Sequence, residues 1–143
     1  MKITNVECFI IDETYPYVII ETDEGLTGIG ECFRRAPFIT KSAVETIYKD
    51  ILIGLNPFEI SIIWSKLFNV SSVTGPYGSL LTAVSGIDTA LWDIKLKYNE
   101  LPLSDQFGGK KKKLIDIYAS SMRRDMSPEE EAERALSFYE QGF

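Results

Sequence analysis

Histidine is absent from the sequence, so the chain offers neither an imidazole base nor an imidazole metal ligand. Cysteine is nearly absent. Cys8 and Cys32 are too few for a disulfide framework and are typical of a reducing compartment, although a bond between them stays open at this point. No stretch approaches the roughly 18 apolar residues of a membrane-spanning helix, and no signal peptide is visible at the N-terminus. The sequence therefore predicts a cytoplasmic protein that does not enter a membrane.

Positive charge is also in short supply. Lys and Arg number 15 against 21 Asp and Glu, which gives a net charge of −6 and excludes a general nucleic-acid surface. The one basic run, 110–113, follows two glycines and is interpreted as a solvated loop, with a phosphate or nucleic-acid patch as the alternative. The 143 residues, 45% of them apolar, suffice to bury a core without a disulfide or a metal.

The first third of the chain predicts a three-stranded antiparallel meander. Residues 2–11, 17–22 and 26–32 are rich in β-formers. A loop at 12–16 separates the first two strands, and a tight turn at 23–25 leads into the third.

Three helices are predicted next. Apolar residues recur every three or four positions within 39–51 and 80–98. Between them, Asn56 is expected to cap a helix that has Pro57 at its first position. The two tryptophans, Trp64 and Trp92, lie among apolar helical neighbours and are expected in the core.

A strand and a helix complete the pattern. Residues 114–120 predict a fourth strand, and Ser127, Pro128 and Glu130 form the signature of a capping box at the start of a helix that ends near Gly142. This last pair has the form of the first unit of a repeating β/α domain that is then cut off.

Three segments carry a family resemblance: 21–31 (ETDEGLTGIGE), 85–95 (SGIDTALWDIK) and 101–109 (LPLSDQFGG). In this order and spacing they resemble the mandelate racemase and muconate-lactonizing branch of the enolase superfamily. Leu96, Tyr98 and Glu100 replace smaller residues that are usual there. The loop 12–16 is shorter than the loop with which some members close over substrate.

The resemblance implies an α+β fold in two parts. Residues 1–108 would form an enolase-like N-terminal capping domain, a three-stranded antiparallel meander plus helices. Residues 109–143 would supply the first strand and helix of a truncated (β/α) barrel, whose full length is about 250 residues. In the family, later barrel strands carry the carboxylates that bind Mg²⁺ and the Lys or His bases. The chain is thus expected to contain no catalytic residue and no metal ligand, and to be inactive alone.

The implied parent is a Mg²⁺-dependent enzyme of the TIM-barrel type that abstracts a proton α to a carboxylate. The metal would stabilise the second negative charge as it develops. An acid-sugar dehydratase (a lyase) is the first reading. A racemase or epimerase, a cycloisomerase, or a non-catalytic α+β binding or oligomerisation module are the alternatives. We expect a homo-oligomer whose full-length form binds a small carboxylate or acid sugar.

Four residues are candidates for substrate binding. Arg34 and Arg35 lie in the loop that, in the family, reaches over the barrel mouth, and a guanidinium binds carboxylate in a two-point fork. Ser121 and Arg123 follow the first expected barrel strand, at the rim where barrel active sites lie. The alternative for both sets is an exposed loop with solvated side chains.

Two acidic residues in the signature segment suggest a metal site at first sight. Asp88 and Asp93 are five positions apart on a helix, so they do not share a face. Asp93 is instead expected to pair with Lys97, four residues on. Both aspartates are therefore interpreted as structural.

Overall fold

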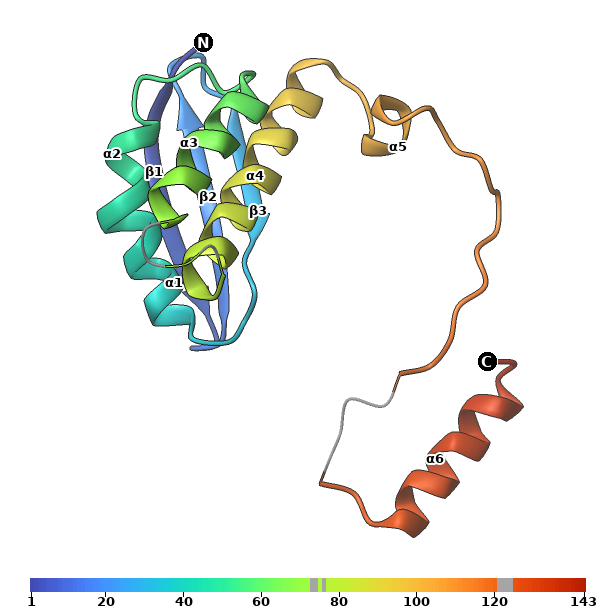
Figure 1. The fold of residues 1–143 in the computed structure, drawn as a ribbon. Coiled ribbons are helices and arrows are strands. Elements are labelled where there is room, and N and C mark those ends of the chain that lie inside the picture. The colour runs from blue at the N-terminus through green and yellow to red at the C-terminus, as the bar shows by residue number, and fades with distance from the viewer. Residues whose placement is uncertain (73–74, 76, 121–124) are drawn as a thin grey trace. The chain divides into compact units, whose positions relative to one another are not determined.

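A computed structural model divides the chain into two compact units, Met1–Gly108 and Gly109–Phe143. It describes residues 1–143 except 73–74, 76 and 121–124. Figure 1 shows the first unit as a small sheet with its helices on one face. None of the described helices is long and apolar enough to cross a membrane.

The first unit begins with the predicted antiparallel meander, in the order β1-β2-β3. Its strands are β1 (Ile3–Ile11), β2 (Tyr15–Thr22) and β3 (Thr27–Glu31). Asp12 and Glu13 have φ of 49° and 54°, and the Thr14 N–H donates to the Ile11 carbonyl at 3.0 Å. Two residues with positive φ make the tight hairpin turn that suits twisted strands. The connection between β1 and β2 is therefore residues 12–14, shorter than the loop expected at 12–16.

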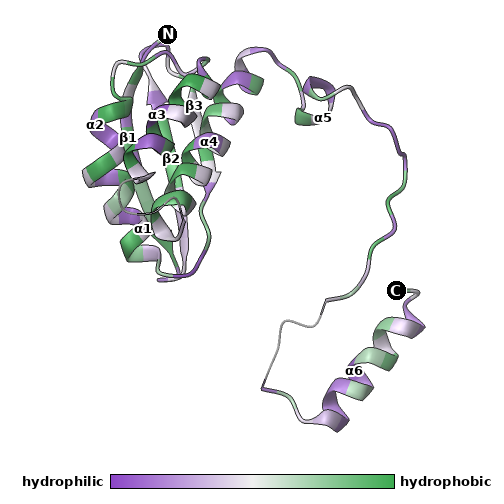
Figure 2. Cartoon of the chain, viewed as in Figure 1, coloured by the Kyte–Doolittle hydropathy of each residue, from purple (hydrophilic) through white to green (hydrophobic). Residues whose placement is uncertain are grey.

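The helices that follow are packed against one face of this sheet (Figure 1). They are α1 (Pro37–Ala43), the π-helical turn η1 (Val44–Tyr48), α2 (Lys49–Leu52), α3 (Ile60–Ser72) and α4 (Ser79–Tyr98). The short α5 (Leu103–Gln106) follows apart from the sheet and has no buried residue. Side chains along the strands alternate between buried and more exposed positions. Figure 2 shows hydrophobic residues where the helices and the strands meet. The fully buried members of this core include Val6, Val18, Ile20, Tyr48, Leu67, Ile87 and Ile94.

The second helix begins later than the sequence predicted. The Asn56 side chain accepts a hydrogen bond from the Phe58 N–H at 3.1 Å, and the Asn56 carbonyl accepts from the Glu59 N–H at 3.1 Å. Asn56 therefore closes a turn at Pro57 and Phe58 instead of capping a helix that begins at Pro57. The reason is that its side-chain amide oxygen accepts a hydrogen bond from a nearby backbone N–H. The helix proper starts at Ile60.

The prediction that both tryptophans lie in the core is correct for one of them. Trp92 is packed against the buried cluster. Trp64 is 40% exposed and stacks on Phe68, with ring centroids 4.9 Å apart. Its position on α3 places it beside the apolar stripe rather than within it, which spacing alone did not resolve.

Strand β3 and helix α4 approach each other more closely than side chains would allow. A Cβ atom at Gly28 would lie 2.1 Å from the Ala90 carbonyl oxygen, and one at Gly30 would lie 2.0 Å from the Gly86 carbonyl oxygen. A Cβ at Gly86 would in turn lie 2.2 Å from the sulfur of Cys32. Glycine is thus required where these two backbones meet. The contact joins the first two segments that carried the family resemblance.

The second unit contains the predicted helix but not the predicted strand. In α6 (Pro128–Glu140), the Ser127 hydroxyl accepts from the Glu130 N–H and the Glu130 carboxylate accepts from the Ser127 N–H, so the capping box is confirmed. Residues 114–120 form no strand, and Leu114 and Tyr118 are 88% and 84% exposed. A barrel strand is held by hydrogen bonds to neighbouring strands, and the described part of this unit supplies none.

Candidate functional site

The candidate substrate loop joins β3 to α1. At its start Cys32 is buried, and its N–H donates to the Pro16 carbonyl at 2.8 Å. At its end Ala36 has a φ of 55° and its carbonyl accepts from the N–H groups of Ile39 and Thr40, with Pro37 opening the helix. The loop is therefore short and fixed at both ends, which limits the directions its side chains can take.

Arg34 and Arg35 occupy the middle of this loop, and both are exposed. Within the described residues neither arginine forms a hydrogen bond or an ion pair. Phe33 and Phe38, on either side, are 57% and 65% exposed. The loop thus offers two exposed, unpaired guanidinium groups, and a guanidinium can bind a carboxylate in a two-point fork.

The other two candidates, Ser121 and Arg123, lie outside the described residues. They belong to the second unit, whereas Arg34 and Arg35 belong to the first. Each pair is therefore considered separately.

The two aspartates of the signature segment take different environments. Asp93 pairs with Lys97 at 2.8 Å, as expected, and its carboxylate also accepts the Ile29 N–H at 2.9 Å. Asp88 is partly covered, and burial raises the pKa of its carboxyl. Across the described residues no three His, Cys, Asp or Glu side chains converge on a possible metal position. Magnesium does not fit the described residues of this chain.

Sequence reasoning missed one polar cluster, which lies beside Cys8 of strand β1. Glu45 accepts the Cys8 N–H at 3.2 Å, and Lys41 donates to the Cys8 carbonyl and to Glu45 at 2.6 Å. Burial alone would raise the pKa of Glu45, but the hydrogen bonds from Lys41 and Cys8 outweigh it and lower that pKa. The Lys-x-x-x-Glu spacing on a helix was the signal available in the sequence.

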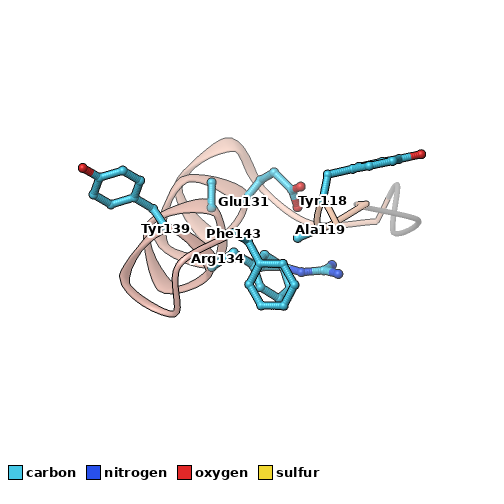
Figure 3. A pocket seen from close by; sticks show the side chains of 8 residues that line it. Tyr118, Ala119, Glu131, Arg134, Tyr139 and Phe143 are labelled. Carbon is cyan, nitrogen blue, oxygen red and sulfur yellow. The ribbon is translucent and has the colours of Figure 1, made fainter. Parts of the chain in front are cut away.

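The second unit holds a cavity of about 290 Å³. Figure 3 shows Glu131 beside Tyr118 and Ala119 at this cavity. One carboxylate oxygen of Glu131 is buried and has no hydrogen-bond partner in the described part of the chain. Arg134, one turn away, lies over the Phe138 ring at 5.4 Å. The cavity is lined mainly by aromatic and aliphatic atoms and carries no constellation of catalytic type.

The meander, the one-sided helical layer and the close β3–α4 contact define the first unit as an enolase-like α+β capping domain. Residues 9–108 match the family described as mandelate racemase / muconate lactonizing enzyme, N-terminal domain. The chain belongs to this family.

Three known proteins illustrate the relationship. The chain is 41% identical over 109 residues to a D-galactarolactone cycloisomerase from Agrobacterium fabrum, covering 76% of this chain and 28% of that protein. It is 33% identical to a D-mannonate dehydratase from Rhizorhabdus wittichii, and the match covers 100% of this chain and 36% of that protein. A Pantoea ananatis enolase solved with bound d-gluconate and Mg is 36% identical, with a TM-score of 0.70. The match covers 78% of this chain and 28% of that protein.

The chain therefore spans about a third of the length of the curated relatives it matches. The family match, residues 9–108, lies within the first unit. Both cysteines are free in the structure, so the disulfide left open by the sequence is not formed.

Proposed function

We propose that this chain is the N-terminal part of a magnesium-dependent enzyme that abstracts a proton α to the carboxylate of an acid sugar, with dehydration as the first reading. The names of the dehydratase relative and of the gluconate-bound structure support an acid-sugar substrate. The observation that carries the proposal for this chain is the pair of exposed, unpaired arginines on a loop fixed at both ends.

In this proposal the two units have different tasks. Residues 1–108 cap an active site, and residues 109–143 begin the barrel that contains it. Magnesium ligands and catalytic bases come from parts of the parent outside this chain, so the isolated chain is inactive. The parent assembles as a homo-oligomer.

A second candidate reaction rests on one specific comparison. The cycloisomerase relative has the higher identity of the two curated relatives described above. A lactone-forming or lactone-opening isomerase would need the same capping loop. Racemase or epimerase activity would also use it, and the bases that separate these reactions are not in this chain.

Arg34 or Arg35 would bind the substrate carboxylate or a hydroxyl of the sugar acid. Adjacent residues in a short loop point in different directions, so one of the two should face the substrate. Loss of a hydrogen bond to a charged group costs roughly 1.5–3 kcal/mol, which is on the order of ten- to a hundredfold in kcat/KM. If the contact is equally strong in the ground state, the change appears in KM.

The test uses the full-length parent with Arg34→Ala and Arg35→Ala made separately. Lys66→Ala, an exposed cation on α3, is the matched control. Against a panel of acid sugars, we expect one arginine variant to lose ten- to a hundredfold in kcat/KM and the control to keep it. Parental values in both arginine variants would refute the role of the loop.

The broader proposal has its own test. Reading the coding sequence beyond Phe143 should reveal a continuation with carboxylates and a Lys or His base at barrel strand ends. A stop codon directly after Phe143 would refute the enzyme and favour the non-catalytic binding or oligomerisation module.

A further inference from the structure

Both edges of the three-stranded sheet are occupied by a lysine–carboxylate pair from a helix. At the β3 edge the pair is Asp93 and Lys97, here called the β3 pair. At the β1 edge it is Lys41 and Glu45, the β1 pair. In each case the acid accepts a strand N–H and the lysine donates to a strand carbonyl. The same arrangement thus occurs twice, on helices far apart in the sequence.

The β3 pair supplies partners to two backbone groups that face away from the sheet. Asp93 accepts the Ile29 N–H at 2.9 Å, and Lys97 donates to the Thr27 carbonyl at 2.8 Å. The two side chains are themselves 2.8 Å apart. An exposed helical ion pair of this spacing adds little stability alone. Its two contacts to the strand edge are therefore the more informative feature.

The two edges are not equally protected. Along β1, the backbone of Ile3 is hydrogen-bonded to Gly54 and Leu55, and the β1 pair covers Cys8 farther along the strand. On the outer side of β3, the described hydrogen bonds from other elements are those of the β3 pair. Ile29, in the middle of the strand, has a side chain that is 47% exposed.

An uncovered β3 edge would be self-complementary. In an antiparallel strand each edge-facing residue presents one N–H and one carbonyl in the same direction. Two copies of β3 related by a two-fold axis would therefore exchange these bonds, with the Ile29 side chains adding apolar contact. Unpaired edges of this kind are templates for association, and natural sheets block them.

We propose that the β3 pair is an edge guard, and that removing it opens β3 as a binding surface for β3 of a second copy of this chain. The proposal is independent of the enzymatic function. It concerns the polar groups of the edge and not the apolar surface of the second unit.

The test compares the 143-residue chain carrying Asp93→Ala and Lys97→Ala with a matched control carrying Asp88→Ala and Lys95→Ala. The control removes the same charges from the same helix, at positions that make no hydrogen bond to the strand. Association through the second unit would be common to all variants and cancels in the comparison. Sedimentation over a range of concentrations and exchange of the Ile29 amide are measured.

At low concentration, we expect the Ile29 amide of the double variant to exchange on the order of ten- to a hundredfold faster than in the control. As the protein concentration rises, the sedimentation mass of the double variant should increase above that of the control. Its Ile29 amide should then become protected from exchange again. Adding Ile29→Lys should abolish this association, because a lysine on an edge strand opposes pairing.

Equal masses for the double variant and the control, or association that leaves the Ile29 amide unprotected, would overturn the proposal. If the double variant does not fold, Asp93→Ala alone replaces it, since it frees the Ile29 N–H and leaves Lys97 in place. It should then associate more than Asp88→Ala; equal association of the two would also overturn the proposal.

Discussion

Gly30→Ala is the substitution that most directly tests the contact between β3 and α4. The new Cβ would lie 2.0 Å from the Gly86 carbonyl oxygen and 2.8 Å from the Ala90 N, both backbone atoms of a helix that cannot turn aside. Real Cβ contacts almost never fall below 3.0 Å, so strand and helix must separate by about 1.0 Å.

The separation has a cost that can be worked out from the same contacts. Moving β3 by this amount stretches the 2.9 Å bond between Ile29 and Asp93 out of range, and a hydrogen bond to a charged group contributes roughly 1.5–3 kcal/mol. Forcing an extra carbon into a packed interior costs roughly 1–3 kcal/mol more. We therefore expect a loss of about 2.5–6 kcal/mol, a large share of the roughly 5–15 kcal/mol that stabilises a typical domain.

Urea unfolding measures this loss directly. With a slope of about 2 kcal/mol per molar, the midpoint should fall by about 1–3 M. Gly25→Ala is the matched control: its φ is +81° but nothing lies within 4 Å of the new Cβ, so only the roughly 1–2 kcal/mol of left-handed strain applies. A loss below about 1 kcal/mol for Gly30→Ala, or no difference from Gly25→Ala, would refute the packing argument.

Three further predictions follow from single features. Burial raises the pKa of Cys32 to about 12 from 9.0, so the unfolded thiol ionises first. The free energy of unfolding should then fall between pH 9 and 12 by up to about 1.4 kcal/mol per unit, and urea melts of Cys32→Ala should show a shallower fall. An unchanged slope would contradict this. Ser127→Ala removes the capping-box hydroxyl and should destabilise α6 by about 1 kcal/mol, visible as faster amide exchange in its first turn; parental exchange would contradict it. Calorimetric titration of the chain with Mg²⁺ should show no tight stoichiometric site, because Mg²⁺ needs converging oxygen ligands; one such site would overturn the expectation.

Much of the first unit could be predicted because its signals are local. Alternating β-formers fixed the three strands, and the 79–98 helix followed from one unbroken apolar stripe. The capping box at Ser127 and Glu130 was also readable, since all its partners lie within four residues. Family segments then identified the capping domain, and residues 9–108 confirmed that assignment.

The errors came from interactions that local spacing does not contain. Asn56 has the chemistry of a cap, but the chain closes a turn there and starts the helix at Ile60. Residues 114–120 have strand-like composition, but a strand needs partners on its edges, and the described second unit has none. Arg34 and Arg35 were found from their place in the loop, and their role as substrate ligands stays a prediction.

The sequence by itself determined the order of the strands and main helices of the first unit, the family and the loop that carries the two arginines, because periodicity, turn residues and motif spacing are properties of neighbouring positions. Only the tertiary structure decided why glycine occurs at 28, 30 and 86, and why Asp93, Lys97, Lys41 and Glu45 occur where they do. Each of these residues meets an atom of a residue distant in sequence, for example Asp93 the N–H of Ile29 across 64 positions. A chain pattern cannot show which backbone atoms will meet, since that depends on how sheet and helices pack together.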